Sequence, residues 1–74
     1  MPETVAMFRF MRIEKDGNEY LVLNKRSGFT LGSIVWEPRW KCWEFAPDFG
    51  TGFTADCLRD LAGFIEKLDK EGKG

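Results

Sequence analysis

The sequence contains no histidine, and its only two cysteines, Cys42 and Cys57, lie fifteen positions apart. Without histidine, the commonest general base is missing, and neither thiol has a histidine partner that would activate it as a nucleophile. The mixed cysteine and histidine ligand sets of structural zinc sites are excluded for the same reason. We therefore predict that the chain is not an enzyme, holds no cofactor or metal, and takes no small-molecule substrate.

Long apolar segments are also missing, because the uninterrupted apolar runs extend over only a few residues. A membrane-spanning helix needs about 20 such residues, so we expect no membrane segment. The first four residues lack the basic and apolar regions of a signal peptide, and we expect a cytoplasmic protein. Cys42 and Cys57 are then predicted to be buried thiols. The alternative, a disulfide between a strand and the helix, needs an oxidising compartment.

No sign of charge dominates, since eleven basic and twelve acidic residues give a formal net charge of −1. A charged binding site would therefore be a local patch instead of a field over the whole molecule. With 74 residues the chain makes one domain, residues 1–74, with a thin core. Aromatic residues make up 15% of the chain, and their large side chains are typical of a packed globule.

The pattern of β-forming residues predicts two hairpins. The first joins a strand over residues 7–14 to a strand over 19–25, and Asp16-Gly17 between them is a hairpin turn signal. The second joins residues 31–37 to residues 40–45 through a turn at Pro38-Arg39, where proline has its φ angle already set. Together they form a four-stranded antiparallel sheet.

An amphipathic helix is predicted over residues 55–70. Thr54 is a good N-cap, and Gly72 is a typical C-terminal stop. Apolar residues recur at steps of three and four along this segment, as one buried helix face requires; they are Leu58, Leu61, Ile65 and Leu68. The predicted fold class is therefore α+β, with the two hairpins followed by one C-terminal helix that packs on one sheet face.

Both faces of the predicted sheet carry apolar side chains. Around the first turn, Met11, Ile13, Tyr20 and Val22 share one face, and Phe8, Phe10, Leu21 and Leu23 share the other. In the second hairpin, Ile34 is predicted opposite Trp43, which groups Trp36, Trp43 and Phe45. One helix covers one face, so we expect a cover for the second: another copy of the chain, a different protein, stacked nucleotides, or residues 1–6 with the loop 46–53.

The segment 36–43 interleaves aromatic and basic side chains. Trp40 is predicted to point away from the helix, and an exposed tryptophan beside an arginine is typical of a protein-binding hot spot. The candidate protein-binding residues are Trp40, Arg39, Val35, Cys42 and Lys41. Stacking platforms for single-stranded nucleic acid have a similar composition, and the alternative nucleic-acid site comprises Arg9, Lys25, Arg26, Arg39, Lys41 and Trp40.

Two known groups of proteins share parts of residues 31–69. The pattern Gly32-x-Ile34-x-Trp36, then Trp40-Lys41-x-Trp43-x-Phe45-x-Pro47, then Thr54-x-x-Cys57-Leu58, resembles small accessory proteins of phages and prophages. That resemblance implies a non-enzymatic protein in the host-cell cytoplasm that binds a host or viral protein complex and modulates or inhibits it.

The strand and helix order also resembles the transcriptional-coactivator family of single-stranded-DNA-binding dimers. The matching stretch is Trp43-x-Phe45-x-Pro47-Asp48 with Gly52-Phe53-Thr54. This sequence has Thr51 where those proteins tend to carry a lysine before the glycine. The resemblance implies a homodimer and, as the alternative function, single-stranded nucleic-acid binding on the aromatic and basic sheet surface.

Overall fold

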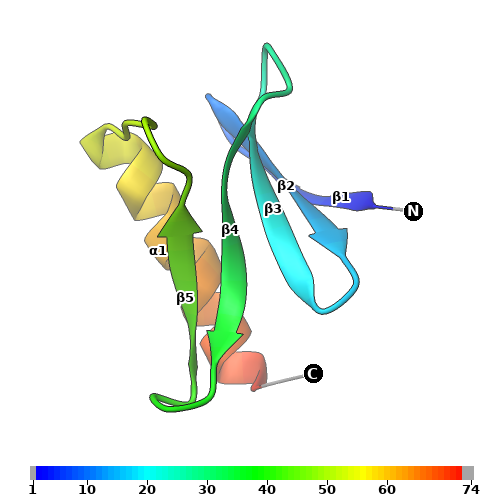
Figure 1. The fold of residues 1–74 in the computed structure, drawn as a ribbon, viewed down its shortest axis with the longest axis vertical. Helices are drawn as coiled ribbons and strands as arrows, with labels where there is room; N and C mark the ends of the chain where they lie inside the picture. The colour runs from blue at the N-terminus through cyan, green and yellow to red at the C-terminus, as the bar shows by residue number, and fades with distance from the viewer. Residues whose placement is uncertain (1, 73–74) are drawn as a thin grey trace.

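The computed structural model describes residues 2–72 and consists of an antiparallel sheet with one helix packed against it (Figure 1). Each strand pairs with the next one along the chain. The elements are β1 (Glu3–Met7), β2 (Met11–Asp16), β3 (Glu19–Asn24), β4 (Thr30–Glu37), β5 (Cys42–Pro47) and α1 (Ala55–Glu71). The predicted α+β class is confirmed, but the sheet has five strands instead of four.

The fifth strand, β1, comes mainly from residues 3–6, which were predicted as a possible cover for the second sheet face, and the predicted strand 7–14 is interrupted after Met7 and begins again only at Met11. The chain turns at residues 8–10, where the Phe8 N–H donates to the Met11 carbonyl at 2.8 Å. Residues before the turn form β1, which pairs with β2 and has an irregular register between Thr4 and Ala6. The turn contains no glycine, proline or asparagine, and Phe8 and Phe10 favour strands. The sequence therefore carried no local signal for it.

The first predicted hairpin is present as β2 and β3, but the predicted Asp16-Gly17 turn is wrong by one residue. Asp16 belongs to β2 and pairs with Glu19, so the turn comprises residues 17–18 and the register differs by two positions from that of an Asp16-Gly17 turn. Its turn contains Gly17 at a φ of 64°, a left-handed conformation that glycine adopts without strain. The register places Ile13 opposite Val22 and Lys15 opposite Tyr20. The predicted set of Met11, Ile13, Tyr20 and Val22 therefore shares one face, and this face packs in the core.

The second hairpin, β4 and β5, has a longer turn than predicted. Its turn comprises residues 38–41, because Glu37 is opposite Cys42, and Lys41 adopts a φ of 54°. Trp36 therefore lies opposite Trp43, two positions from the predicted register. A shift of two residues leaves every side chain on its own face, so the predicted grouping of Trp36, Trp43 and Phe45 is retained.

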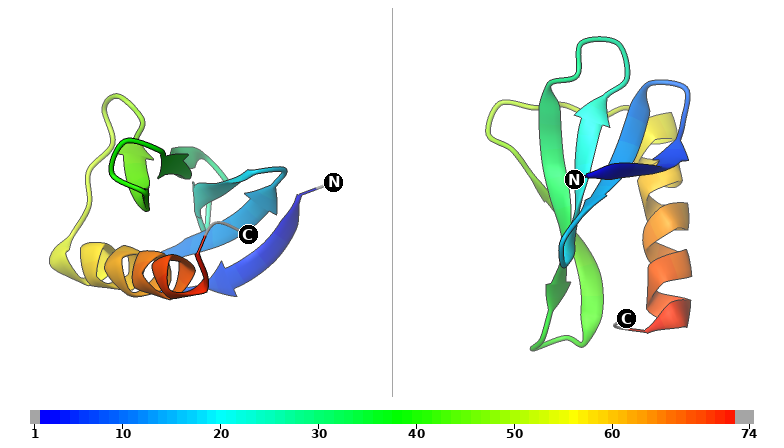
Figure 2. Two further views of the ribbon diagram at one scale, coloured as in Figure 1. Left: turned by 90° about the horizontal axis from the view of Figure 1, so that it is seen from below. Right: turned by 90° about the vertical axis from the view of Figure 1, so that its right-hand side faces the viewer.

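The core lies between this sheet face and α1, which runs along one side of the sheet (Figure 2). Trp43, from the edge strand β5, belongs to this core and makes edge-to-face contacts to Tyr20 at 5.5 Å and to Trp36 at 5.7 Å between ring centroids. Its indole Nε1 is buried without a hydrogen-bond partner among residues 2–72. The fully or nearly fully buried members of the cluster are Met11, Ile13, Val22, Ile34, Trp43, Cys57, Leu61 and Leu68.

Helix α1 has the predicted caps. The Thr54 hydroxyl accepts from the Cys57 N–H at 3.3 Å, and the Gly72 N–H donates to the Asp69 carbonyl at 3.2 Å. Its buried residues are Cys57, Leu61 and Leu68. The prediction that Leu58 belongs to the buried stripe is wrong, because this side chain is 51% exposed. Leu58 follows Cys57 directly, so it projects about 100° around the helix from the buried position.

One side-chain hydrogen bond ties the helix to the sheet. The Asp69 carboxylate accepts from the Trp43 backbone N–H at 2.9 Å. A carboxylate near the end of a helix is unfavourable for the helix dipole, so this contact accounts for its position. We expect Asp69→Ala to lower the free energy of unfolding by about 1–2 kcal/mol, measured by urea denaturation. Glu66→Ala, which removes an exposed carboxylate from the same helix, is the control and should change stability by less than about 0.5 kcal/mol.

The second sheet face differs from the prediction. Leu21, Leu23, Val35 and Cys42 do lie on it, but Leu23 is buried and the other three are half-buried. Arg12 is the cross-strand partner of Leu23, and its long aliphatic stem shares this face. Phe8 and Phe10 lie in the turn outside β1 and β2. The large apolar side chains that are mostly exposed include no β2–β5 residue of this face, and Phe8 packs against the core cluster instead, so the apolar surface of this face is smaller than predicted.

The two cysteines are both free thiols. Cys57 is buried in the core, as predicted, whereas Cys42 is only half-buried. Trp43 faces the core, so its strand neighbour Cys42 points to the opposite side of the sheet. The alternative of a strand-to-helix disulfide is therefore incompatible with this fold.

Candidate functional site

The turn 38–41 presents a tryptophan to solvent. Trp40 is 72% exposed and lies in the turn, instead of on a strand as predicted. Before it, Arg39 binds Glu37 through both its backbone N–H, at 3.2 Å, and its guanidinium Nε, at 2.7 Å. The side-chain hydrogen bond from Arg39 lowers the pKa of Glu37, and Glu37 raises the pKa of Arg39. The ion pair and the left-handed Lys41 give the turn a defined shape.

Of the other predicted protein-binding residues, two lie in this turn and two lie on the adjoining strands. Arg39 and Lys41 flank Trp40 directly, and both are exposed. Cys42 begins β5 at the foot of the turn, and Val35 lies further along β4. Both of these side chains are half-buried on the face that α1 leaves open. The turn is therefore the exposed part of the predicted set, and the sheet residues form its base.

The predicted nucleic-acid residues separate into two groups. In a sheet whose strands follow chain order, successive turns alternate between the two ends. The turn 38–41 lies at the bottom of Figure 1, whereas the β3–β4 turn, residues 25–29, lies at the top. Lys25 and Arg26 in that turn, with Arg9 in the turn 8–10, are therefore at the end opposite Arg39, Trp40 and Lys41. These six residues do not form one continuous surface.

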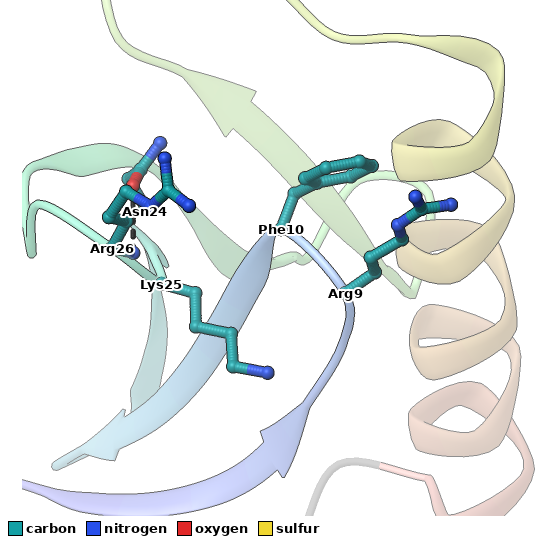
Figure 3. Close-up of a pocket in the computed structure, with 5 residues that line it drawn as sticks. All are labelled: Arg9, Phe10, Asn24, Lys25 and Arg26. Carbon is teal, nitrogen blue, oxygen red and sulfur yellow. Dashed lines mark hydrogen bonds between the residues drawn. The ribbon is translucent and has the colours of Figure 1, made fainter.

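We call the end that carries turn 8–10, turn 25–29 and loop 48–54 the basic end. It contains an open pocket of about 710 Å³ between the first two turns (Figure 3). The pocket lining combines three cationic side chains, one amide and one aromatic ring, and it includes no carboxylate. The lining residues are Arg9, Phe10, Asn24, Lys25 and Arg26.

The candidate binding residues predicted from the sequence did not include the exposed aromatic residues at the basic end. Phe10 is 48% exposed, Phe29 is 76% exposed and Phe49 is fully exposed. For Phe29 and Phe49 a signal was available, because each is an aromatic residue inside a segment of turn-forming residues: Ser27-Gly28-Phe29 and Pro47-Asp48-Phe49-Gly50. Such segments are usually polar.

Strand β1 forms one edge of the sheet and carries exposed apolar residues. Val5 is 40% exposed and Met7 is 56% exposed. A hollow of about 360 Å³ lies between β1 and α1, with Val5, Phe8 and Phe64 among its lining residues. An edge strand with apolar side chains is a feature through which two chains can associate. The sequence analysis placed neither Val5 nor Met7 on an exposed apolar face, so this edge is a feature that the structure adds.

The part of the chain that the structure describes contains neither a cluster of metal-ligand side chains nor a membrane-spanning helix. Within residues 2–72, no three or more cysteine, aspartate or glutamate side chains are grouped so that they could hold a metal ion. In the same part of the chain, the one helix is too short and too polar to cross a membrane.

No protein-family model, no curated protein and no solved structure matches the chain.

Proposed function

We propose that this chain is a non-enzymatic binding module that acts in the cytoplasm, as an accessory protein of phage or prophage type, and docks onto a host or viral protein complex. The observation that supports the proposal is the 72% exposure of Trp40 in the turn 38–41. Tryptophan and arginine are the residues most enriched among interface hot spots. A tryptophan left in solvent beside Arg39 is therefore best explained by a partner that buries it.

The shape of the turn favours this role energetically. Binding costs free energy when loops and side chains become ordered at the interface. Here the Glu37–Arg39 ion pair, at 2.7 Å, and the left-handed backbone at Lys41 already define the turn. The aromatic ring is thus presented from a structured base, so less ordering remains for the moment of binding. Inhibition or modulation of the partner would follow from occupancy of its surface.

The test is a comparison of two aromatic substitutions at opposite ends of the sheet. Trp40→Ala should leave the circular dichroism of the fold unchanged, because the side chain is exposed, but should weaken partner binding by about 2 kcal/mol or more. The immobilised chain captures partners from lysate of its native cell, and calorimetry then measures the affinity of the captured protein. Phe49→Ala, which removes a fully exposed ring at the basic end, is the control and should bind as the wild type does. Equal binding by the wild type and Trp40→Ala would contradict the proposal.

The predicted homodimer is tested by sedimentation of the wild type, Trp40→Ala and a second variant, Val5→Lys. If Trp40 lies in a self-interface, Trp40→Ala should halve the apparent mass while the fold is kept. If the edge strand β1 forms the interface, the mass should instead fall in Val5→Lys, because a charge on an edge strand opposes pairing. A wild-type chain that stays monomeric at high micromolar concentration would contradict the homodimer.

A second candidate function is single-stranded nucleic-acid binding. The specific observation in its favour is the gathering of Arg9, Lys25 and Arg26 around one pocket with an aromatic ring in its lining. Cationic grooves with aromatic platforms are the common means of binding single strands. This candidate would use the basic end, opposite the Trp40 turn, so the two functions are separable by mutation.

A further inference from the structure

The three cations of the basic-end pocket have no ion-pair partners. Arg9, Lys25 and Arg26 take part in none of the salt bridges found among residues 2–72, and no carboxylate lines the pocket. The chain as a whole has one more acidic than basic residue, so this local excess of positive charge is not a result of composition. Like charges that gather in one pocket repel each other, and a bound anion relieves that repulsion.

The pocket is built on a fixed backbone. The Lys25 N–H donates to the Phe10 carbonyl at 3.0 Å, which ties turn 25–29 to turn 8–10. The Asn24 Oδ1 accepts from the backbone N–H groups of Arg26 and Ser27, both at 2.9 Å. These bonds hold the backbone from which the Lys25 and Arg26 side chains extend. The Asn24 Nδ2 donates none of the hydrogen bonds found within residues 2–72, so it remains available to an acceptor on a ligand.

An aromatic ring stands next to these cations. Phe10 is 48% exposed, and the Arg9 guanidinium carbon lies 5.1 Å from its ring centroid. Figure 3 shows the Phe10 ring between Arg9 on one side and Arg26 with Asn24 on the other. A nucleobase stacks on the faces of aromatic rings and on guanidinium planes. The pocket therefore offers charge for a phosphate and a flat surface for a base within one set of side chains.

Two further rings lie at the same end of the sheet. Phe29 is held in its turn by its N–H, which donates to the Ser27 hydroxyl at 3.2 Å, and by its carbonyl, which accepts from the Asn24 N–H at 2.8 Å. Phe49 projects from a turn closed by the Thr51 hydroxyl, which donates to the Asp48 carbonyl at 2.8 Å. These hydrogen bonds fix the backbone of the two turns, and both rings are exposed there, so each presents an aromatic surface to a ligand at this end of the sheet.

We propose that the basic end binds single-stranded nucleic acid, with a backbone phosphate in the pocket among Arg9, Lys25 and Arg26 and the adjoining base stacked on Phe10. The proposal rests on the second candidate function and gives it a place at the turns instead of on the sheet surface. A small anion would use the cations but would leave the ring without a role. A duplex would present its phosphates but keep its bases stacked inside, so the single strand is the form that uses both features.

The experiment measures the fluorescence anisotropy of a short labelled oligothymidylate as the protein is titrated in, at several salt concentrations. Lys25→Gln and Arg26→Gln should each weaken binding and make it less dependent on salt. The slope of log affinity against log salt concentration should become smaller in magnitude by about 0.7 for each phosphate that is no longer neutralised. Phe10→Leu should weaken binding about fivefold or more with the salt slope unchanged, because it removes stacking and keeps the charge. Lys15→Gln is the matched control, since Lys15 is an exposed lysine of β2 at the opposite end.

The outcomes separate the site from the function. Weaker binding by the three pocket variants, with Lys15→Gln and circular dichroism unchanged, supports the proposal, as does weaker binding of a duplex of equal length. Pocket variants that bind the oligonucleotide as tightly as the wild type overturn the proposed pocket, but they do not contradict single-stranded nucleic-acid binding itself. Weaker binding by Arg39→Gln would then place the nucleic-acid site at the Trp40 turn. Inorganic phosphate that competes as well as the oligonucleotide, with no effect of Phe10→Leu, overturns the stacking. No binding at low salt overturns both the pocket and the candidate function.

Discussion

Leu61→Ala is expected to lower the free energy of unfolding by about 2–5 kcal/mol. Leu61 is 2% exposed and belongs to the cluster that joins α1 to the sheet. Helix α1 is the only described element that covers this sheet face. A cavity left by the missing Leu61 side chain would therefore not be filled by another layer of the protein, and the full cost of the cavity is expected. Domains of this class are stable by about 5–15 kcal/mol, and a small domain is expected at the lower end. The variant should therefore be substantially unfolded, which urea denaturation followed by tryptophan fluorescence would show.

Leu58→Ala is the matched control for this prediction. It removes the same side chain from the same helix, three positions earlier, but Leu58 is 51% exposed. Its expected effect is within about 0.5 kcal/mol, because a half-exposed side chain buries little apolar surface. Similar destabilisation at the two positions, or an effect below about 1 kcal/mol at Leu61, would show that α1 does not pack on the sheet as described.

Gly32→Ala is expected to lower the free energy of unfolding by about 3 kcal/mol, at the upper end of the usual cost of overpacking. Gly32 is buried in β4, opposite Pro47 of β5. A Cβ atom at this position would lie 2.6 Å from the Ala46 carbonyl oxygen and 2.8 Å from the Phe45 Cε1. The oxygen belongs to the paired strand, so it cannot move away without disturbing the β4–β5 ladder. The substitution should also shift the near-ultraviolet circular dichroism, because the displaced ring is aromatic.

Gly52→Ala provides the comparison for Gly32→Ala. A Cβ atom added at Gly52 meets nothing within 4 Å, and its φ is outside the left-handed region. We expect a change within about 0.5 kcal/mol, measured in the same denaturation experiment. Equal stability of the two alanine variants would contradict the close approach of Phe45 to β4.

The helix was readable from the sequence because its signals are local. Thr54 and Gly72 act through hydrogen bonds to residues three positions away, Cys57 and Asp69, so the capping residues identify the ends of the helix without knowledge of the rest of the fold. The same holds for Gly17, whose turn is fixed by its own backbone conformation. For the residues that do lie in β2–β5, the sheet face was also predictable, because alternation along a strand is independent of a register shift by two residues; Phe8, Phe10 and Trp40, which lie in turns, are the exceptions.

The features that depend on strand pairing could not be read from the sequence. The turn 8–10 is held by the Phe8 to Met11 hydrogen bond and by pairing of β1 with β2, while its own residues favour an extended chain. The four-residue turn 38–41 accompanies the pairing of Trp36 with Trp43, whose rings contact each other across β4 and β5. In both cases the energy comes from contacts between strands, which local propensity does not contain.

The two candidate sites also differ in whether local sequence or strand pairing brings their residues together. Trp40, Arg39 and Lys41 could be grouped from the sequence alone, since they are neighbours in the chain, and the lack of histidine-dependent chemistry was evident there too. The grouping of Arg9 with Lys25 and Arg26 around Phe10, at the end of the sheet opposite Trp40, depends on how the strands pair and could not be predicted from the sequence. The physical reason is the bond between the Lys25 N–H and the Phe10 carbonyl: it joins residues fifteen positions apart, and they meet only when strand register has brought the two turns to the same end.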